Sequence, residues 1–145
     1  MTGYRVGVDI GGTKVAIGLL DSEGNILQRD VIATPPITDG SARFTDFICQ
    51  AIQGLLQTGG VAIPQVEGFG VGIPGTADWK NGVALYCPNL FGNEKIPLAD
   101  LFERRLGIRP AIVQDSWAAA YAEYRFGTGE TSADMICVTV GTGVG

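Results

Sequence analysis

The sequence YRVGVDIGGTKVAIGLL spans residues 4–20 and carries the first clear structural signal of the chain. Its two halves, Tyr4–Ile10 and Lys14–Leu20, are rich in β-branched residues and flank a short glycine turn, which predicts two strands in a hairpin. A turn-forming DSEGN cluster comes next, and Ile26–Ala33 has the composition of a third strand. Together they predict an antiparallel meander, which ends before Pro35.

Helices and strands alternate after the meander. Apolar residues from Phe44 to Leu56 recur with the period of one helix face, with Asp39 or Ser41 available as the N-cap and Gly59 at the end. We further expect strands over residues 66–73, 83–86, 111–113 and 135–140, helices over 97–106 and 116–126, and a polar turn over 76–82. The order is βββαβαβα followed by a last strand, which predicts an α/β fold with a mixed sheet.

The composition excludes several classes of protein. A length of 145 residues suits one domain or one half of a two-lobed protein, and 46% apolar residues exclude a disordered acidic tail. The net charge of −5 argues against a basic nucleic-acid-binding surface, and the lack of histidine excludes histidine catalysis or histidine-bound zinc within these residues. Three widely spaced cysteines indicate neither a disulfide framework nor a zinc site. Without a signal peptide or a membrane-length apolar stretch, we expect a cytoplasmic protein that binds no membrane.

The DIGGTK segment at residues 9–14 is the first candidate site. One interpretation is a type I′ hairpin turn, whose two glycines adopt positive φ. The other is a phosphate-binding loop, because glycines let backbone N–H groups approach an anion while Thr13 and Lys14 add a hydroxyl and a charge. Asp9 could then hold Mg²⁺ through water. A Walker A loop is excluded, since G-x-x-x-x-G-K-[ST] does not occur.

The GVGIPG segment at residues 70–75 matches the dinucleotide-binding pattern G-x-G-x-x-G. That fingerprint must open a helix at once, whereas residues 76–82 have no apolar face, so we disfavour it. The segment is instead expected to be a strand that needs small residues where a helix crosses it. Alternatively, its end at Gly75 lies beside a ligand and makes a backbone contact.

Asp115 lies between an expected strand and an expected helix, in the sequence IVQDSWAAA. Its side chain can cap the helix, and a carboxylate at the carboxyl end of such a strand also lies where α/β sheets bind ligands. Asp115 could accept a proton from a substrate hydroxyl, as an aspartate does in other phosphotransferases. The helix N-terminus favours its ionised form, so it would be a weak base that suits late departure of the proton.

A second glycine run, GTGVG, occupies residues 141–145. It is either a hairpin turn or a second phosphate loop that grips a triphosphate together with the first. Two such loops with a strand-end aspartate between them favour phosphate binding.

Five segments resemble the ROK family (repressors, open reading frames and kinases) of the actin-like, ribonuclease-H-like ATPase superfamily. They are VGVDIGGTKVAIGLLD, GVGIPGTAD, CPNLFGN, VQDSWAAAYAEYRFG and VTVGTGVG, in the order and spacing of the family. The resemblance implies a ribonuclease-H-like lobe of an ATP-dependent sugar kinase that uses Mg²⁺ and phosphorylates a hexose or an N-acetylhexosamine.

The resemblance also implies roles for individual residues. Asp115 would be the general base. The phosphates of ATP would be bound by Asp9, Ile10, Gly11, Gly12, Thr13, Lys14, Gly141, Thr142, Gly143, Val144 and Gly145. The sugar would be bound by Gly75, Asn89, Gln114 and Asp115. The family pattern N-D-A-N is QDSW here, so Gln114 and Trp117 replace two asparagines and alter the expected sugar pocket.

Several expectations concern the rest of such a protein. By resemblance this chain is the N-terminal lobe, and a C-terminal lobe outside this sequence would carry a structural zinc and most of the adenosine pocket. The full-length protein would be a homodimer, and this lobe alone would be inactive. The alternatives are a sugar-sensing transcriptional regulator and a non-catalytic sugar-binding protein. The first strand begins too close to Met1 for a preceding DNA-binding helix-turn-helix, and the retention of Asp9, Lys14 and Asp115 favours the kinase.

Overall fold

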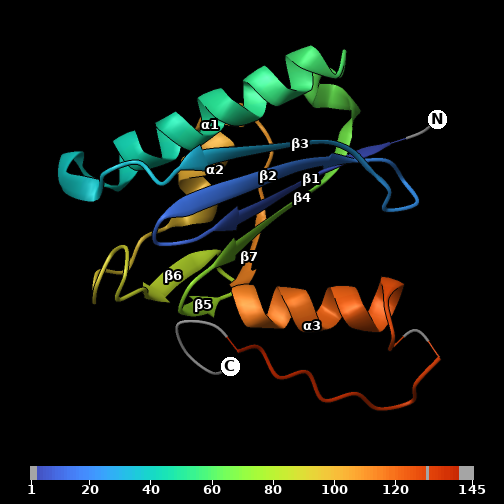
Figure 1. The fold of residues 1–145 in the computed structure, drawn as a ribbon. Helices are drawn as coiled ribbons and strands as arrows, with labels where there is room; N and C mark the ends of the chain where they lie inside the picture. The colour runs from blue at the N-terminus through green and yellow to red at the C-terminus, as the bar shows by residue number, and fades with distance from the viewer. Residues whose placement is uncertain (1–2, 130, 141–145) are drawn as a thin grey trace.

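The computed structural model describes residues 3–129 and 131–140 as an α/β fold (Figure 1). Its elements are β1 (Tyr4–Ile10), β2 (Lys14–Leu20), β3 (Ile26–Ala33), α1 (Ser41–Thr58), β4 (Val66–Ile73), β5 (Thr76–Asp78), β6 (Val83–Tyr86), α2 (Leu98–Leu106), β7 (Ala111–Gln114) and α3 (Asp115–Phe126). Short 3-10 turns at Ile37–Asp39 and Ile63–Gln65 precede α1 and β4.

A mixed five-stranded sheet forms the centre, in the order β3-β2-β1-β4-β7. The strands β1, β2 and β3 form the expected antiparallel meander, while β4 pairs in parallel with β1 and β7 in parallel with β4. The strands β5 and β6 form a separate hairpin. The parallel arrangement matters for the site, because it brings the carboxyl ends of β1, β4 and β7 to one edge of the sheet.

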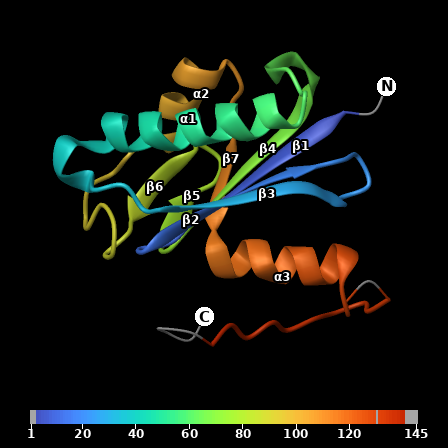
Figure 2. The ribbon, with the colours of Figure 1, turned by 45° about the horizontal axis from the view of Figure 1, so that its top comes forward.

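The two faces of the sheet differ in chemistry because side chains alternate along each strand. On β1, Val6, Val8 and Ile10 are buried, and Val8 pairs in register with Ile17 of β2 and Val71 of β4. This face carries α1 and α2, whereas α3 lies on the opposite side (Figure 2). Full burial of each such aliphatic side chain stabilises the fold by roughly 1.5–3 kcal/mol.

Small residues make up the face toward α3. Gly18, Gly7, Gly70 and Ala111 form one continuous row across four strands. A cavity of about 770 Å³ lies between this row and the alanine-rich side of α3. No residue of α3 is fully buried, so the helix covers this face loosely.

The helix α1 buries the predicted apolar face but begins differently from the prediction. Neither Asp39 nor Ser41 is its N-cap; Gly40 has that position, with φ of 88° and no side-chain cap. Asp39 instead pairs with Arg43, at 3.4 Å. The helix ends at Thr58, before Gly59 as expected, and α2 ends before Gly107, whose φ is 73°.

Two other predictions are wrong. Residues 76–82 do not form one turn, because Thr76–Asp78 is a strand paired with β6. Three residues are too few to show strand periodicity, so only the partner strand reveals it. The predicted strand over 135–140 does not form either; within 131–140 only Val140 makes an isolated bridge.

The last described segment follows α3. Much of it runs beside α3 on the side away from the sheet (Figures 1 and 2), while Thr139 lines the cavity between α3 and the sheet. Its outward side chains are left in solvent, with Ile136 91% and Val138 63% exposed.

In the described part of the chain, no helix is both long and apolar enough to cross a membrane.

Candidate active site

The DIGGTK segment forms the tight turn between β1 and β2. The Gly11 N–H donates a hydrogen bond to the Lys14 carbonyl at 2.9 Å, so the hairpin alternative is correct in its topology. Positive φ is not found at Gly11 or Gly12, so the type I′ geometry is wrong. Gly11 is required by space instead, because a Cβ there would lie 2.9 Å from the Lys14 carbonyl oxygen.

The end of β3 supports this turn from one side. The Thr34 hydroxyl donates to the Gly11 carbonyl at 2.7 Å, and the Thr34 N–H donates to the Thr13 carbonyl at 3.0 Å. Gly12, Thr13 and Lys14 remain exposed. A rigid turn with an exposed glycine, hydroxyl and ammonium group is compatible with phosphate binding as well as with a hairpin.

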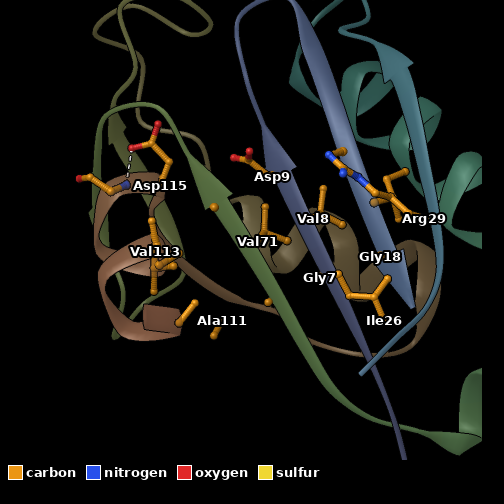
Figure 3. A pocket seen from close by; sticks show the side chains of 18 of the residues that line it. Gly7, Val8, Asp9, Gly18, Ile26, Arg29, Val71, Ala111, Val113 and Asp115 are labelled. Atoms are coloured by element: carbon orange, nitrogen blue, oxygen red, sulfur yellow. Dashed lines mark hydrogen bonds between the residues drawn. The ribbon is translucent and has the colours of Figure 1, made fainter. Parts of the chain in front are cut away.

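The sheet register brings two carboxylates together. Asp9 is near the carboxyl end of β1, and Asp115 follows the last residue of β7. Gly72 of β4 lies between them, paired in register with Asp9. A Cβ at Gly72 would lie 3.6 Å from Asp9 Oδ1 and 3.7 Å from Asp115 Cα. The two carboxylates therefore flank a position that carries no side chain, at one end of the cavity under α3 (Figure 3).

The charges at this position affect each other. Burial raises the pKa of Asp9, the negative charge of Asp115 raises it further, and Lys14 partly offsets both. Asp115 is the first residue of α3 and not its N-cap, which is Gln114; the Asp115 carboxylate accepts the Ser116 N–H at 2.7 Å. Among the described residues, the cavity that Asp9 and Asp115 line is also lined by Arg29.

The GVGIPG segment runs from the end of β4 into β5. A strand follows it instead of a helix, which confirms that it is not a dinucleotide fingerprint. Gly75 has φ of 151°, and a Cβ on it would lie 2.0 Å from the Tyr86 carbonyl oxygen. This glycine is therefore required by its packing against the end of β6.

Asn89 lies in the loop 87–92 and against the first glycine turn. A Cβ on Gly12 would lie 3.5 Å from Asn89 Cβ. Asn89 is thus next to the turn expected to bind phosphate, as the sugar-site interpretation requires. Neither Asn89 nor Gly75 lines the cavity under α3. Gln114 is exposed at the end of β7, paired in register with Ile73.

The sequence analysis did not single out Cys87 as a site residue. Cys87 is the first residue of the loop that contains Asn89. It is fully buried, and burial together with the nearby Asp115 raises the pKa of its thiol to about 11. The segment CPNLFGN carries the only sequence signal for it. Residues 141–145, the second predicted phosphate loop, lie outside the described residues. Within the described part of the chain, no cluster of three or more metal-ligating side chains occurs.

The sequence profile of the ROK family matches residues 5–145. The chain belongs to the ROK family. A glucokinase of Streptomyces coelicolor is 35% identical over 143 residues, covering 99% of this chain and 42% of the relative. An N-acetylmannosamine kinase of Escherichia coli O6:H1 is 36% identical over 141 residues, covering 95% of this chain and 44% of the relative.

Solved structures agree with this assignment. The crystal structure of a ROK family glucokinase from Streptomyces griseus in complex with glucose and AMPPNP is 42% identical, with a TM-score of 0.84. The alignment covers 99% of this ROK chain and 43% of that one. This ROK chain therefore spans less than half the length of the relatives it matches. The ribonuclease-H-like fold expected from the sequence is confirmed.

Proposed function

We propose that this ROK chain contributes the catalytic base and the first phosphate loop of an ATP-dependent sugar kinase. The observation that carries the proposal is the convergence of Asp9, Asp115 and the exposed Gly12–Lys14 turn at one edge of the sheet. Both relatives named above phosphorylate sugars by their names, and the solved glucokinase binds glucose and an ATP analogue. The acceptor is a hexose or an N-acetylhexosamine.

In this proposal Asp115 accepts the proton of the sugar hydroxyl that attacks the γ-phosphorus of ATP. The Ser116 N–H donates to the Asp115 carboxylate at 2.7 Å and holds it in place. A weak base suits a loose transition state, in which the hydroxyl loses its proton late. Most of the rate acceleration would come from donors aimed at the phosphoryl group, including the turn at Gly11, Gly12, Thr13 and Lys14. The residues Gly141, Thr142, Gly143, Val144 and Gly145 are proposed to form a second such loop.

Magnesium fits the donor chemistry of Asp9. The raised pKa of Asp9 reflects partial burial next to a second carboxylate, and a hard divalent cation would stabilise the ionised form of Asp9. Asp9 would bind Mg²⁺ through water, and the ion would neutralise phosphate charge. A structural zinc in a second lobe is proposed on the family resemblance alone.

Sugar recognition is proposed for Gly75, Asn89 and Gln114. The position of Asn89 beside the Gly12 turn supports this role, because a Cβ on Gly12 would lie 3.5 Å from Asn89 Cβ. Gln114 directly precedes the proposed base. We also propose that the whole protein is a two-lobed cytoplasmic homodimer in which residues 1–145 are the N-terminal lobe. The match to 42% of a glucokinase is compatible with a lobe of a larger protein.

The test measures ADP release by the whole protein across glucose, mannose, N-acetylglucosamine and N-acetylmannosamine. We expect at least one sugar to be phosphorylated, and Asp115→Asn to lower kcat by about 10²–10⁴-fold, the usual contribution of a general base. Asp30→Asn is the matched control, because Asp30 is an exposed residue of β3, outside the site. Asp115 is not the base if its variant stays within a few-fold of the parent.

The other classes of function give different results in the same experiment. Sugar binding without ADP release would indicate a non-catalytic sugar-binding protein. Sugar-dependent DNA binding by the whole protein would indicate a transcriptional regulator. Either result overturns the kinase proposal.

A further inference from the structure

Arg109 connects α2, which directly precedes it in the sequence, to a turn 28 residues away. It lies in the loop between α2 and β7, and its Nη1 donates to Asp100 Oδ1 at 2.6 Å and to Glu103 Oε2 at 2.8 Å, both on α2. Its Nη2 donates to the Asn81 carbonyl at 3.1 Å, in the turn between β5 and β6. The guanidinium group therefore ties the tip of the β5–β6 hairpin to α2.

We propose that Arg109 is a positioning residue for the sugar site: by holding the β5–β6 hairpin on α2, it sets the places of Gly75 and Asn89. The inference rests on the proposed function for the identity of the ligand. Arg109 itself touches neither Gly75 nor Asn89 through any hydrogen bond of the described residues.

The hairpin turn leaves little room for movement at its contact with α2. The Ala99 N–H donates to the Gly82 carbonyl at 3.0 Å. A Cβ on Gly82 would lie 2.3 Å from Ala99 Cβ, so the turn is in direct contact with the first turn of α2. Asp78 binds the residue before Gly82: its carboxylate accepts a hydrogen bond from the Asn81 side-chain N–H at 2.7 Å. Arg109 then binds the Asn81 carbonyl, so the turn is held on both sides of its tip.

The hairpin transmits this position to the site because its strands are firmly connected. Ala84 of β6 exchanges two hydrogen bonds with Ile96, at 2.8 and 2.9 Å. At the end of β6, Cys87 exchanges two with Gly92, at 3.0 and 2.8 Å, which closes the loop that contains Asn89. Gly75 at the start of the hairpin packs on the Tyr86 carbonyl. A shift of the hairpin relative to α2 would therefore move both proposed sugar-binding residues together.

Lysine cannot replace Arg109 in this arrangement. The guanidinium group uses two different nitrogens to reach α2 on one side and Asn81 on the other, whereas an ammonium group is a single compact donor centre. Both carboxylates raise the pKa of Arg109, consistent with a permanently charged anchor. The exposed ion pairs of Arg109 with Asp100 and Glu103 add little to the stability of the fold. We therefore expect Arg109 to act mainly on the position of the β5–β6 hairpin.

A matched control is available on α2. Arg105 forms a two-pronged ion pair with Asp46 of α1, and this pair joins α2 to α1, away from the hairpin. Arg105→Gln thus removes one arginine and its ion pair with Asp46. Arg109→Gln removes one arginine and its two ion pairs, with Asp100 and Glu103. They differ in whether the hairpin loses its anchor.

The experiment uses the whole protein and two readouts. Loss of the Arg109 anchor is expected to raise the KM for sugar by about fivefold, the upper end of the range for an exposed ion pair, while kcat and the KM for ATP change by less than about twofold. Arg109→Lys should resemble Arg109→Gln, and Arg105→Gln should leave the KM for sugar unchanged. Amide hydrogen exchange is the second readout: Cys87 and Gly92 should exchange faster in Arg109→Gln than in Arg105→Gln.

The outcomes separate this inference from the proposed function. Absence of sugar phosphorylation in the parent protein overturns the kinase, while faster exchange at Cys87 and Gly92 would still support the anchor. Equal sugar KM values and equal exchange in the two glutamine variants overturn the positioning role. Should Arg109→Gln not fold, the double variant Asp100→Asn with Glu103→Gln removes the same anchor from the α2 side and must give the same pattern.

Discussion

Replacement of Gly75 by alanine tests how the start of the β5–β6 hairpin is built. Gly75 has φ of 151°, and a new Cβ would lie 2.0 Å from the Tyr86 carbonyl oxygen, 3.0 Å from its carbonyl carbon and 3.1 Å from Cys87 Cα. All three atoms belong to the backbone, so no side chain can rotate away. The hairpin must open by roughly 1.4 Å to restore an ordinary contact of 3.4 Å.

Two effects set the expected cost. An alanine held at this φ costs about 1–3 kcal/mol. Thr76 of β5 pairs with Tyr86 of β6. Moving these two strands apart breaks backbone hydrogen bonds between them, and each lost hydrogen bond costs about 1 kcal/mol. We therefore expect Gly75→Ala to lower the free energy of unfolding by about 2–4 kcal/mol, combining the two effects. In the whole protein it should also weaken sugar binding.

Gly92→Ala is the control for this prediction. Gly92 also has positive φ, at 59°, but no atom lies within 4 Å of the position that a Cβ on it would take. This variant should cost only about 1 kcal/mol, the penalty of the left-handed conformation. Urea unfolding of the 145-residue chain, followed by far-UV circular dichroism, compares the two variants with the parent. The packing argument is refuted if Gly75→Ala is as stable as Gly92→Ala.

Two further predictions follow from the pKa values. The pKa of Asp9 is raised in the fold, so its ionised form destabilises the folded state at pH values above that pKa, and this penalty disappears below the ordinary value of 3.8. Asp9→Asn should therefore be more stable than the parent to urea at pH 7, with the difference shrinking as the pH falls toward 3.8, and lower stability at pH 7 would contradict this. Burial raises the pKa of the Cys87 thiol to about 11 and that of Cys49 to about 12, so both should resist iodoacetamide at pH 8 until urea unfolds the chain. The half-buried Cys137 should react first. If all three thiols of the folded chain react with iodoacetamide at the same rate, Cys49 and Cys87 are not buried.

Local signals in the sequence were sufficient for most of the fold. The meander of β1, β2 and β3 was predicted because each strand and its tight turn lie within a few residues of each other. The apolar face of α1 was predicted because one helix period is visible over Phe44–Leu56. The predicted strand at 135–140 failed because a strand needs a neighbour, and alternating apolar residues cannot show whether one is present. The strand β5 was missed for the converse reason, since its pairing with β6 defines it.

The candidate site shows the same division between local and distant information. The sequence alone identified Asp9, the Gly11–Lys14 turn and Asp115 as candidates, because each stands at a recognisable junction of strand, turn or helix. Their proximity depends on the parallel register of β1, β4 and β7, with Gly72 between the two carboxylates. The link from Arg109 to the β5–β6 turn had no sequence signal, because Asn81 is 28 residues away. Residue type and local spacing thus determine which groups can do chemistry, whereas strand pairing and packing between distant segments determine which of them meet.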